Sequence, residues 1–212
     1  MRRRTTFVPK ENYLLATYNI TTLGYNQILS ADFDISQVKE LWVNGVKSST
    51  IGASYYFSST GTKTIKYVFE HDGFITGVNM FQDCTTLKTA DMTNLSGEFC
   101  KSLTGMFIGC TGVTTIDFTG FDATNITSTI NMFNSCTSLI SLKFGDKFTP
   151  VNLTDVRNMF HYCTKLTTLD MRHFDFSKVT QWGYTWARCF ALTSLYLNTS
   201  LILLNKLLLF EL

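Results

Sequence analysis

The segment 158–180, NMFHYCTKLTTLDMRHFDFSKVT, contains the pattern that decides the fold. Its first six residues, which end in a cysteine, recur with variations along the chain. The pattern surrounds five cysteines: Cys84, Cys110, Cys136, Cys163 and Cys189. These cysteines are 26, 26, 27 and 26 residues apart. A fixed period of this length is typical of repeat architectures, whereas a zinc site needs close cysteine pairs.

Apolar residues follow each cysteine at constant distances. Around Cys163 they are Leu166, Leu169 and Met171, which stand three, six and eight residues after it. The last two alternate with polar neighbours, and this alternation predicts a strand with one buried face. One repeat has too few such residues to form a core, so we expect neighbouring strands to stack in parallel, about 4.8 Å apart.

Two other positions of the repeat complete the predicted core. The Asn-Met-Phe-x-x-Cys stretch has apolar residues at i, i+1 and i+4, which favours about one helical turn opposite the strand. Cys100 stands where later repeats have Ile126, Leu153 and Val179, so it is predicted to be an ordinary core residue. The cysteine column is interpreted as buried thiols that act as small hydrophobic side chains.

The combination N-M-F-x-x-C-x-x-L-x-x-L-D-hydrophobic, followed by F-D-x-S/T-x-V-T, resembles the repeat of BspA-like bacterial surface proteins, a subclass of leucine-rich repeats. The resemblance covers about residues 74–198. It implies a right-handed, leucine-rich-repeat-like solenoid of about five coils, with a parallel β-ladder and short helical turns. Family members are mostly adhesion or host-interaction proteins, and similar repeats occur in phage proteins. The resemblance therefore implies a cell-surface or virion location.

Three parts of the chain are expected. Residues 1–72 show no repeat and are predicted to form a small, all-β, β-sandwich-like capping unit. It would contain strands at 13–22 and 41–44 and a hairpin over 55–69 that turns near Thr60-Gly61. Residues 73–200 are the predicted repeat region. The apolar segment 201–212 is predicted to cap its end, with a contact to another subunit or an out-of-frame tail as alternatives.

Membrane insertion has no support in the sequence. A spanning helix needs roughly 18 to 20 apolar residues. The segment 201–212, LILLNKLLLFEL, has only twelve residues and is interrupted by Asn205 and Lys206. Near the other end, TTFVPKENYLL is not the continuous apolar core of a signal peptide. We therefore expect no transmembrane segment, signal peptide or anchor in these residues.

Charge and reactive residues exclude several classes of function. The net charge is +2 and the basic residues are dispersed except for Arg2–Arg4, so no nucleic-acid partner is expected. The three histidines fall on unrelated repeat positions. No nucleophile–base pair, metal-ligand spacing or phosphate-binding glycine motif is present. The sequence therefore predicts a protein that is not an enzyme and has no metal or cofactor.

The outward residues of the predicted strands form the candidate binding surface. The position seven residues after each cysteine is chemically varied, and an arginine lies beside it in the fourth repeat. The candidate binding residues are Asp91, Asp117, Lys143, Asp170, Arg172 and Tyr196. A column that mixes acid, base and aromatic side chains is not required by packing, so we interpret it as the site of specificity, with Tyr196 as an anchor.

Three hypotheses of function follow. The leading hypothesis is a non-enzymatic recognition or adhesion module that binds a protein or glycan through the strand face. The alternative is a structural or accessory component of a phage virion or surface assembly. In that case the N-terminal unit and a self-association contact through residues 201–212 would make the assembly contacts. A glycan hydrolase that uses paired carboxylates of the strand face is a weaker third hypothesis.

Overall fold

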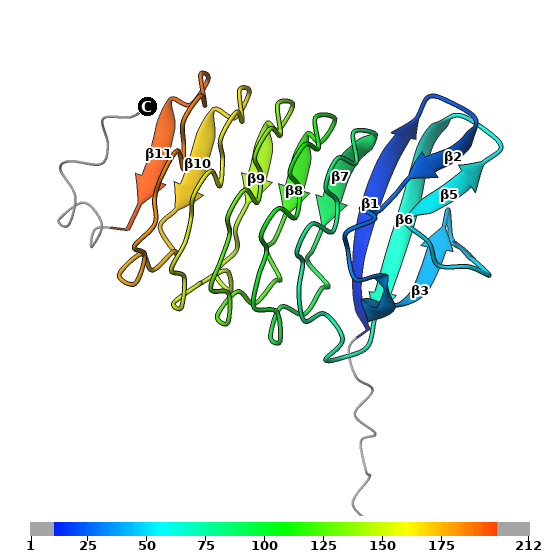
Figure 1. Ribbon diagram of the computed structural model, residues 1–212, viewed down its shortest axis with the longest axis horizontal. Helices are drawn as coiled ribbons and strands as arrows, with labels where there is room; N and C mark the ends of the chain where they lie inside the picture. The colour runs from blue at the N-terminus through cyan, green and yellow to red at the C-terminus, as the bar shows by residue number, and fades with distance from the viewer. Residues whose placement is uncertain (1–10, 199–212) are drawn as a thin grey trace, which may run out of the picture.

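A computed structural model describes residues 11–198 of the chain, almost entirely as strands and turns (Figure 1). The N-terminal part contains β1 (Asn12–Ile20), β2 (Gly24–Gln27), β3 (Val38–Val43), β4 (Val46–Lys47), β5 (Ser54–Phe57) and β6 (Gly61–Phe69). The repeats contribute β7 (Leu87–Asp91), β8 (Thr115–Asp117), β9 (Ser141–Lys143), β10 (Thr168–Met171) and β11 (Ser194–Leu197). Within these residues the single helical element is the 3-10 turn η1 (Ile35–Gln37).

The main sheet is mixed and continuous across the two parts. Its seven strands follow the order β4-β3-β6-β1-β7-β8-β9. All pairings from β4 through to β7 are antiparallel. The two remaining pairings, β7 with β8 and β8 with β9, are parallel. Strand β1 is the fourth of the seven, and it links the N-terminal strands to the repeats because it pairs with β6 on one edge and with β7 on the other. Figure 1 shows β1 directly beside β7.

The predicted fold class is therefore wrong. The expected leucine-rich-repeat-like solenoid, preceded by a separate β-sandwich-like unit, is replaced by a mostly-sheet fold built on one mixed sheet. The physical reason is the pairing of β1 with β7. The backbone of β1 hydrogen-bonds to the edge of β7 that the other repeats leave uncovered, so the N-terminal strands join the sheet of the repeats and do not form a separate sandwich. The periodicity of the repeats does not indicate which strand pairs with the outer edge of the first repeat strand, β7.

The predicted helical turns are also absent from the described repeats. The Asn-Met-Phe-x-x-Cys segments instead form successive i→i+3 turns, such as Met80 N–H to Gly77 O and Cys84 N–H to Phe81 O. A helix cannot continue there because Asn79 and Asp83 both have positive φ. The same two positions of every later repeat also have positive φ, so each of these turn segments bends twice.

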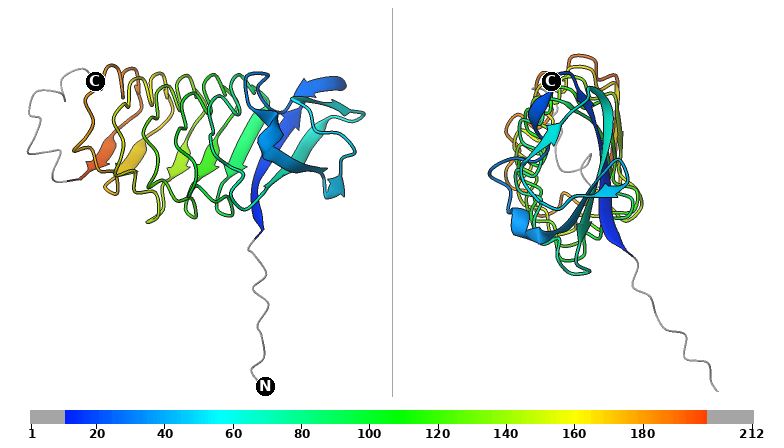
Figure 2. Two further views of the ribbon diagram at one scale, coloured as in Figure 1. Left: turned by 60° about the horizontal axis from the view of Figure 1, so that its bottom comes forward. Right: turned by 90° about the vertical axis from the view of Figure 1, so that its right-hand side faces the viewer.

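One hydrophobic core runs through the molecule from β1 to the last repeats. The turn-segment phenylalanines stack along it: the rings of Phe81, Phe107, Phe133 and Phe160 follow one another at 5.3 to 5.7 Å. From the strand side, Phe118 meets both Phe107 and Phe133 edge-on. Seen end-on, the strands and the turn segments lie on opposite sides of an oval outline (Figure 2).

The parallel pairing is interrupted once. Strands β10 and β11 form a separate two-stranded sheet, and β9 does not pair with β10. The interruption follows the only 27-residue spacing between the repeat cysteines. The added residue lengthens the link after β9, where Phe144 and Phe148 are four residues apart, whereas Phe118 and Phe121 are three apart. Across this break the repeats still stack, because the bridge between Ser128 and Asp155 is kept.

The N-terminal strand predictions are confirmed in part. The predicted strand at 13–22 is β1, and its Leu14, Ala16, Tyr18 and Ile20 are all buried. The predicted strand at 41–44 is the end of β3, which turns through Asn44-Gly45 into β4. The predicted hairpin over 55–69 is wrong, because β5 pairs with β2 whereas β6 pairs with β1 and β3.

Several predictions concern the termini and the boundary between the two parts of the chain. Within residues 11–198, no helix has the length and apolar character needed to cross a membrane. The predicted C-terminal cap at 201–212 and the basic cluster Arg2–Arg4 lie outside the described residues. The division at residue 72 stays a prediction, although strands from both sides of it share the main sheet.

Candidate functional site

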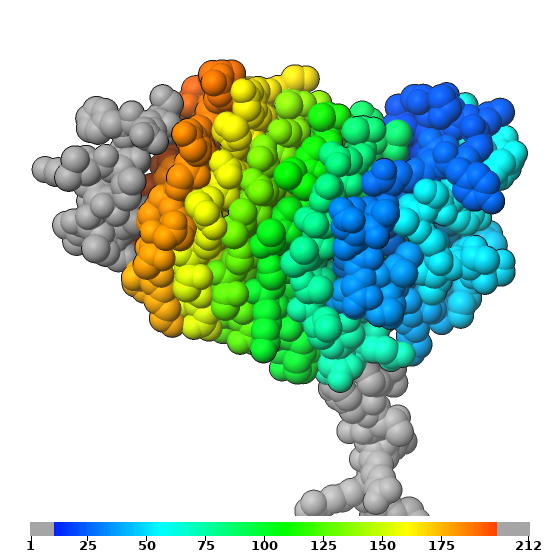
Figure 3. Space-filling view, in the orientation of Figure 1, coloured from blue at the N-terminus to red at the C-terminus, as the bar shows by residue number. Residues whose placement is uncertain are grey.

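The strand face is the outward surface of β7 to β11, formed by residues five, seven and nine after each repeat cysteine. Neighbouring strands are in register, so residues of the seven-after column lie next to each other: Asp91 beside Asp117, Asp117 beside Lys143, and Asp170 beside Tyr196. The space-filling view shows the repeats as adjacent bands across the molecule (Figure 3). The sequence prediction that these residues share one face agrees with this register.

The predicted site residues fall into two groups because the sheet is interrupted between β9 and β10. In the first group, Lys143 Nζ lies 3.7 Å from Asp117 Oδ2, and the lysine side chain is exposed. Burial opposes ionisation of Asp117, but hydrogen bonds from Thr119 and the charge of Lys143 outweigh it and lower the pKa of this carboxyl. Asp117 and Lys143 therefore form a neutral ion pair, and Asp91 beside them gives the group a formal charge of about −1.

The second group, Asp170, Arg172 and Tyr196, joins β10 to β11. The guanidinium of Arg172 donates to both carboxylate oxygens of Asp170, from Nε at 3.0 Å and from Nη2 at 2.6 Å. Its Cζ lies 5.5 Å from the centre of the Tyr196 ring, which is 49% exposed. Hydrogen bonding to Arg172 lowers the pKa of Asp170. Since both the ring and the cation are held in place and open to solvent, this is the best-organised part of the strand face.

The aspartates of the column have a structural role that the sequence analysis missed. Asp91, Asp117 and Asp170 each accept a hydrogen bond from the backbone N–H two residues later, at 2.9 to 3.1 Å. This bond stabilises the turn that ends each strand. The Asp-x-Thr and Asp-x-Arg spacings are the signal that could have revealed it. The cationic and aromatic members of the column are thus freer for recognition than its carboxylates.

Beyond β7 the outward surface of the sheet continues over β1, β6 and β3. A hollow of about 460 Å³ there is lined by Leu15, Trp42, Thr64, Lys66 and neighbours. Lys66 Nζ pairs with Glu11 at 2.7 Å and lies 4.2 Å from the centre of the Tyr13 ring. These side chains are not among the candidate binding residues predicted from the sequence, because residues 1–72 are predicted to form a separate cap. The alternation of Tyr13, Leu15 and Thr17 with buried residues was the available signal.

The cysteines and histidines of the described residues form no disulfide and no metal site. All six thiols are free, and five of them are buried, as predicted for Cys100 and the repeat column; Cys189 is only partly buried. Burial raises the pKa of the Cys84 and Cys100 thiols to about 12, so neither is a reactive nucleophile near neutral pH. Over residues 11–198, no group of three or more histidine, cysteine or acidic side chains is arranged to hold a metal ion.

Comparison with known protein families finds a match over the repeats. A family described as "Mycoplasma protein of unknown function, DUF285" matches residues 76–198. The chain belongs to the DUF285 family. The match covers β7 to β11, which are the repeat strands of this DUF285 protein, and leaves out β1 to β6. No curated protein and no solved structure matches the chain.

Proposed function

We propose that this DUF285 protein is a non-enzymatic recognition module that binds a protein or glycan through its strand face. The observation that carries the proposal is the group formed by Asp170, Arg172 and Tyr196. A fixed cation beside an exposed aromatic ring is the kind of anchor that dominates recognition surfaces. Its position at the surface, rather than in the core, means that packing does not require it.

The charges of the strand face support recognition rather than hydrolysis. Its carboxylates are committed to turns, and both Asp117 and Asp170 also pair with cations. A glycosidase needs one carboxyl group that stays protonated as the acid, yet the pKa of each of these two is lowered. The resemblance to BspA-like surface proteins agrees with an adhesion role and a cell-surface or virion location.

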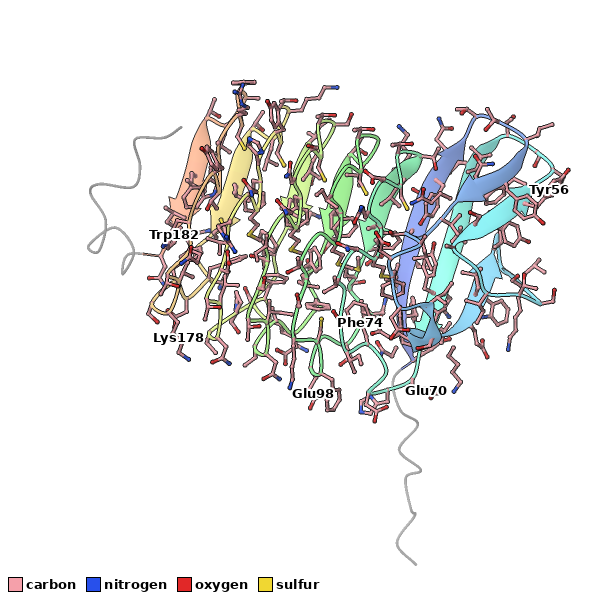
Figure 4. All side chains as sticks on the ribbon, in the orientation of Figure 1. Tyr56, Glu70, Phe74, Glu98, Lys178 and Trp182 are labelled. Carbon is pink, nitrogen blue, oxygen red and sulfur yellow. The ribbon has the colours of Figure 1, made fainter. Side chains whose placement is uncertain are left out.

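A second proposal, assembly into a larger structure, is favoured by the N-terminal end of the molecule. Leu23, Tyr25, Val46 and Tyr56 are exposed there, and the rings of Tyr25 and Tyr56 pack edge-on at 5.5 Å. Figure 4 shows Tyr56 at the far end from Trp182 of the last repeat. Contacts through this end would leave the strand face open.

The test is a matched pair of triple variants probed on a glycan array and a peptide array. Lys143→Ser, Arg172→Ser and Tyr196→Ser together remove two exposed cations and one ring from the strand face. Each ring or charge hot spot contributes about 2 kcal/mol or more, so we expect at least a thirtyfold loss of binding.

The control carries the same three chemical changes elsewhere. Lys101→Ser, Arg157→Ser and Tyr25→Ser also remove one exposed lysine, one exposed arginine that pairs with an aspartate two residues earlier, and one exposed ring. We expect this control to bind as the wild type does. Equal binding by the two variants, whether both retain it or both lose it, would show that the strand face is not the binding surface.

A further inference from the structure

A pocket of about 580 Å³ lies on the turn segments of the fourth and fifth repeats, across the core from the strand face. It is called the turn pocket here and is lined by Asn158, His161, Tyr162, Tyr184, Ala187 and Arg188. The first three of these belong to the Asn-Met-Phe-x-x-Cys segment of the fourth repeat, and the others to the equivalent segment of the fifth. Its volume falls within the range of small-molecule sites.

Three of the lining residues stand where the backbone disfavours them. The first and fifth positions of each turn segment have positive φ. Earlier repeats fill five of these six positions with residues that tolerate it, namely Asn79, Asp83, Gly105, Gly109 and Asn131, and the sixth with the small Ser135. In the turn pocket the same positions hold Tyr162 (φ 60°), Tyr184 (φ 59°) and Arg188 (φ 63°). Bulky residues in this conformation are strained, and strained residues of this kind cluster at functional sites.

These three side chains are exposed to solvent and are not part of the hydrophobic core. Tyr184 is 63% exposed and Tyr162 is 36% exposed. The Arg188 Cζ lies 5.1 Å from the centre of the Tyr162 ring, and the His161 ring is 4.4 Å from that of Tyr162 and 6.0 Å from that of Tyr184. The core therefore does not account for them, since Asn or Gly serves the fold equally well in the earlier repeats.

The charge of the turn pocket is +1. Among residues 11–198 no carboxylate lies within ion-pair distance of Arg188, and no acidic residue lines the pocket. Burial and the charge of Arg188 lower the pKa of His161, so its imidazole is neutral at pH 7 and serves as a hydrogen-bonding group. The pocket thus combines open aromatic faces, one cation without an acidic partner, and neutral polar groups from His161 and Asn158.

We propose that the turn pocket binds an acidic sugar, a pyranose ring that carries a carboxylate. The exposed ring of Tyr184 offers a flat face for the apolar C–H side of a sugar ring, while the amide of Asn158 and the imidazole of His161 can hydrogen-bond its hydroxyls. The guanidinium of Arg188 recognises the carboxylate, for which its forked donors are suited. The site is separate from the strand face and does not depend on the function proposed for it.

The test is a titration followed by amide NMR shifts, with methyl β-D-glucuronide as the probe. The neutral methyl β-D-glucoside and acetate each carry half of the proposed chemistry. We expect the glucuronide to shift amides of residues 158–162 and 184–188, with at least tenfold weaker binding of the glucoside and of acetate. Equal binding of glucuronide and glucoside would overturn the proposal, because Arg188 would then have no role.

The decisive variant combines Tyr162→Asn, Tyr184→Asn and Arg188→Asn, which restores residues that tolerate positive φ. We expect glucuronide binding to fall at least tenfold while the melting temperature stays equal or rises. A lower melting temperature would show that the three side chains are structural and would overturn the proposal, as would retained binding. The strand-face variant of Lys143, Arg172 and Tyr196 should bind glucuronide normally, which separates this test from that of the proposed function.

Discussion

At the residue scale, the repeat cysteines do more than fill space. The thiols of Cys110, Cys136, Cys163 and Cys189 each donate to the carbonyl oxygen of a phenylalanine one repeat earlier, at 2.9 to 3.1 Å. The repeat pattern predicts that these cysteines are buried, but it indicates only small hydrophobic side chains and no hydrogen bond. The hydrogen bond could not be predicted because it depends on how far one repeat is displaced along the next.

These thiols predict a loss of stability at alkaline pH. Burial raises the pKa of Cys84 and Cys100 to about 12, whereas a thiol in the unfolded chain has a pKa of about 8.5. Because the folded-state pKa is raised, their contribution is complete below about pH 8.5 and disappears as the pH rises toward 12. Between pH 9 and 10, each buried thiol should lower the free energy of unfolding by about 1 kcal/mol.

The measurement is urea denaturation under reducing conditions at pH 7, 9 and 10. Tyr18 and Tyr67 are fully buried and their pKa values are also raised, so pH values above 10 are avoided. The variant Cys100→Ala isolates one thiol and should reduce the decrease between pH 9 and 10 by about 1 kcal/mol. An unchanged slope would mean that Cys100 ionises in the folded protein.

At the scale of the element, the strands are short and depend on their neighbours. Strands β8 and β9 have three residues each, so side-chain packing between strands matters more than the length of a ladder. Ile116 of β8 is fully buried and has a neighbour on both sides, Ala90 and Leu142. Leu142 of β9 is only partly buried because no strand pairs with it on the β10 side.

This difference predicts unequal costs for two similar substitutions. Ile116→Ala leaves a cavity among fixed neighbours and should lower the free energy of unfolding by about 2 to 5 kcal/mol. Leu142→Ala lies at the interrupted edge, where the structure can relax, and should cost about half as much. Denaturant unfolding of both variants checks the order, and a larger loss for Leu142 would mean that β9 and β10 pair in solution.

At the scale of the whole molecule, the N-terminal strands and the repeats depend on one another. The edge of β7 is covered by β1, and Thr17 Oγ1 and Thr89 Oγ1 lie 2.7 Å apart across this pair. Farther along the boundary, Asn12 donates to Glu70 O and accepts from the Ser96 N–H. Phe74 joins both parts through ring contacts with Phe69 and Phe121.

Removal of residues 1–72 tests this dependence. The fragment 73–212 would expose the edge of β7 and buried side chains such as Phe81 and Leu87. We expect it to aggregate or to unfold without a cooperative transition, because exposed strand edges and apolar surface favour association. Circular dichroism melting and gel filtration measure this. A monomeric fragment with a cooperative transition would show that the repeats fold by themselves and support the division at residue 72.

Sequence by itself determined the properties that repeat along the chain. The recurring cysteines, leucines and phenylalanines predicted which side chains are buried, and the alternation after each cysteine located β7 to β11 and their outward residues. These predictions succeed because burial and strand alternation are local consequences of where apolar side chains stand.

Tertiary structure alone decided how the elements join. The pairing of β1 with β7, the break between β9 and β10 and the turn pocket between the last two repeats all bring together residues whose contacts no local pattern specifies. A strand edge offers the same backbone donors and acceptors to any partner, so its neighbour is chosen by the packing of the whole core. For the same reason the predicted fold class was wrong although its buried residues were largely right.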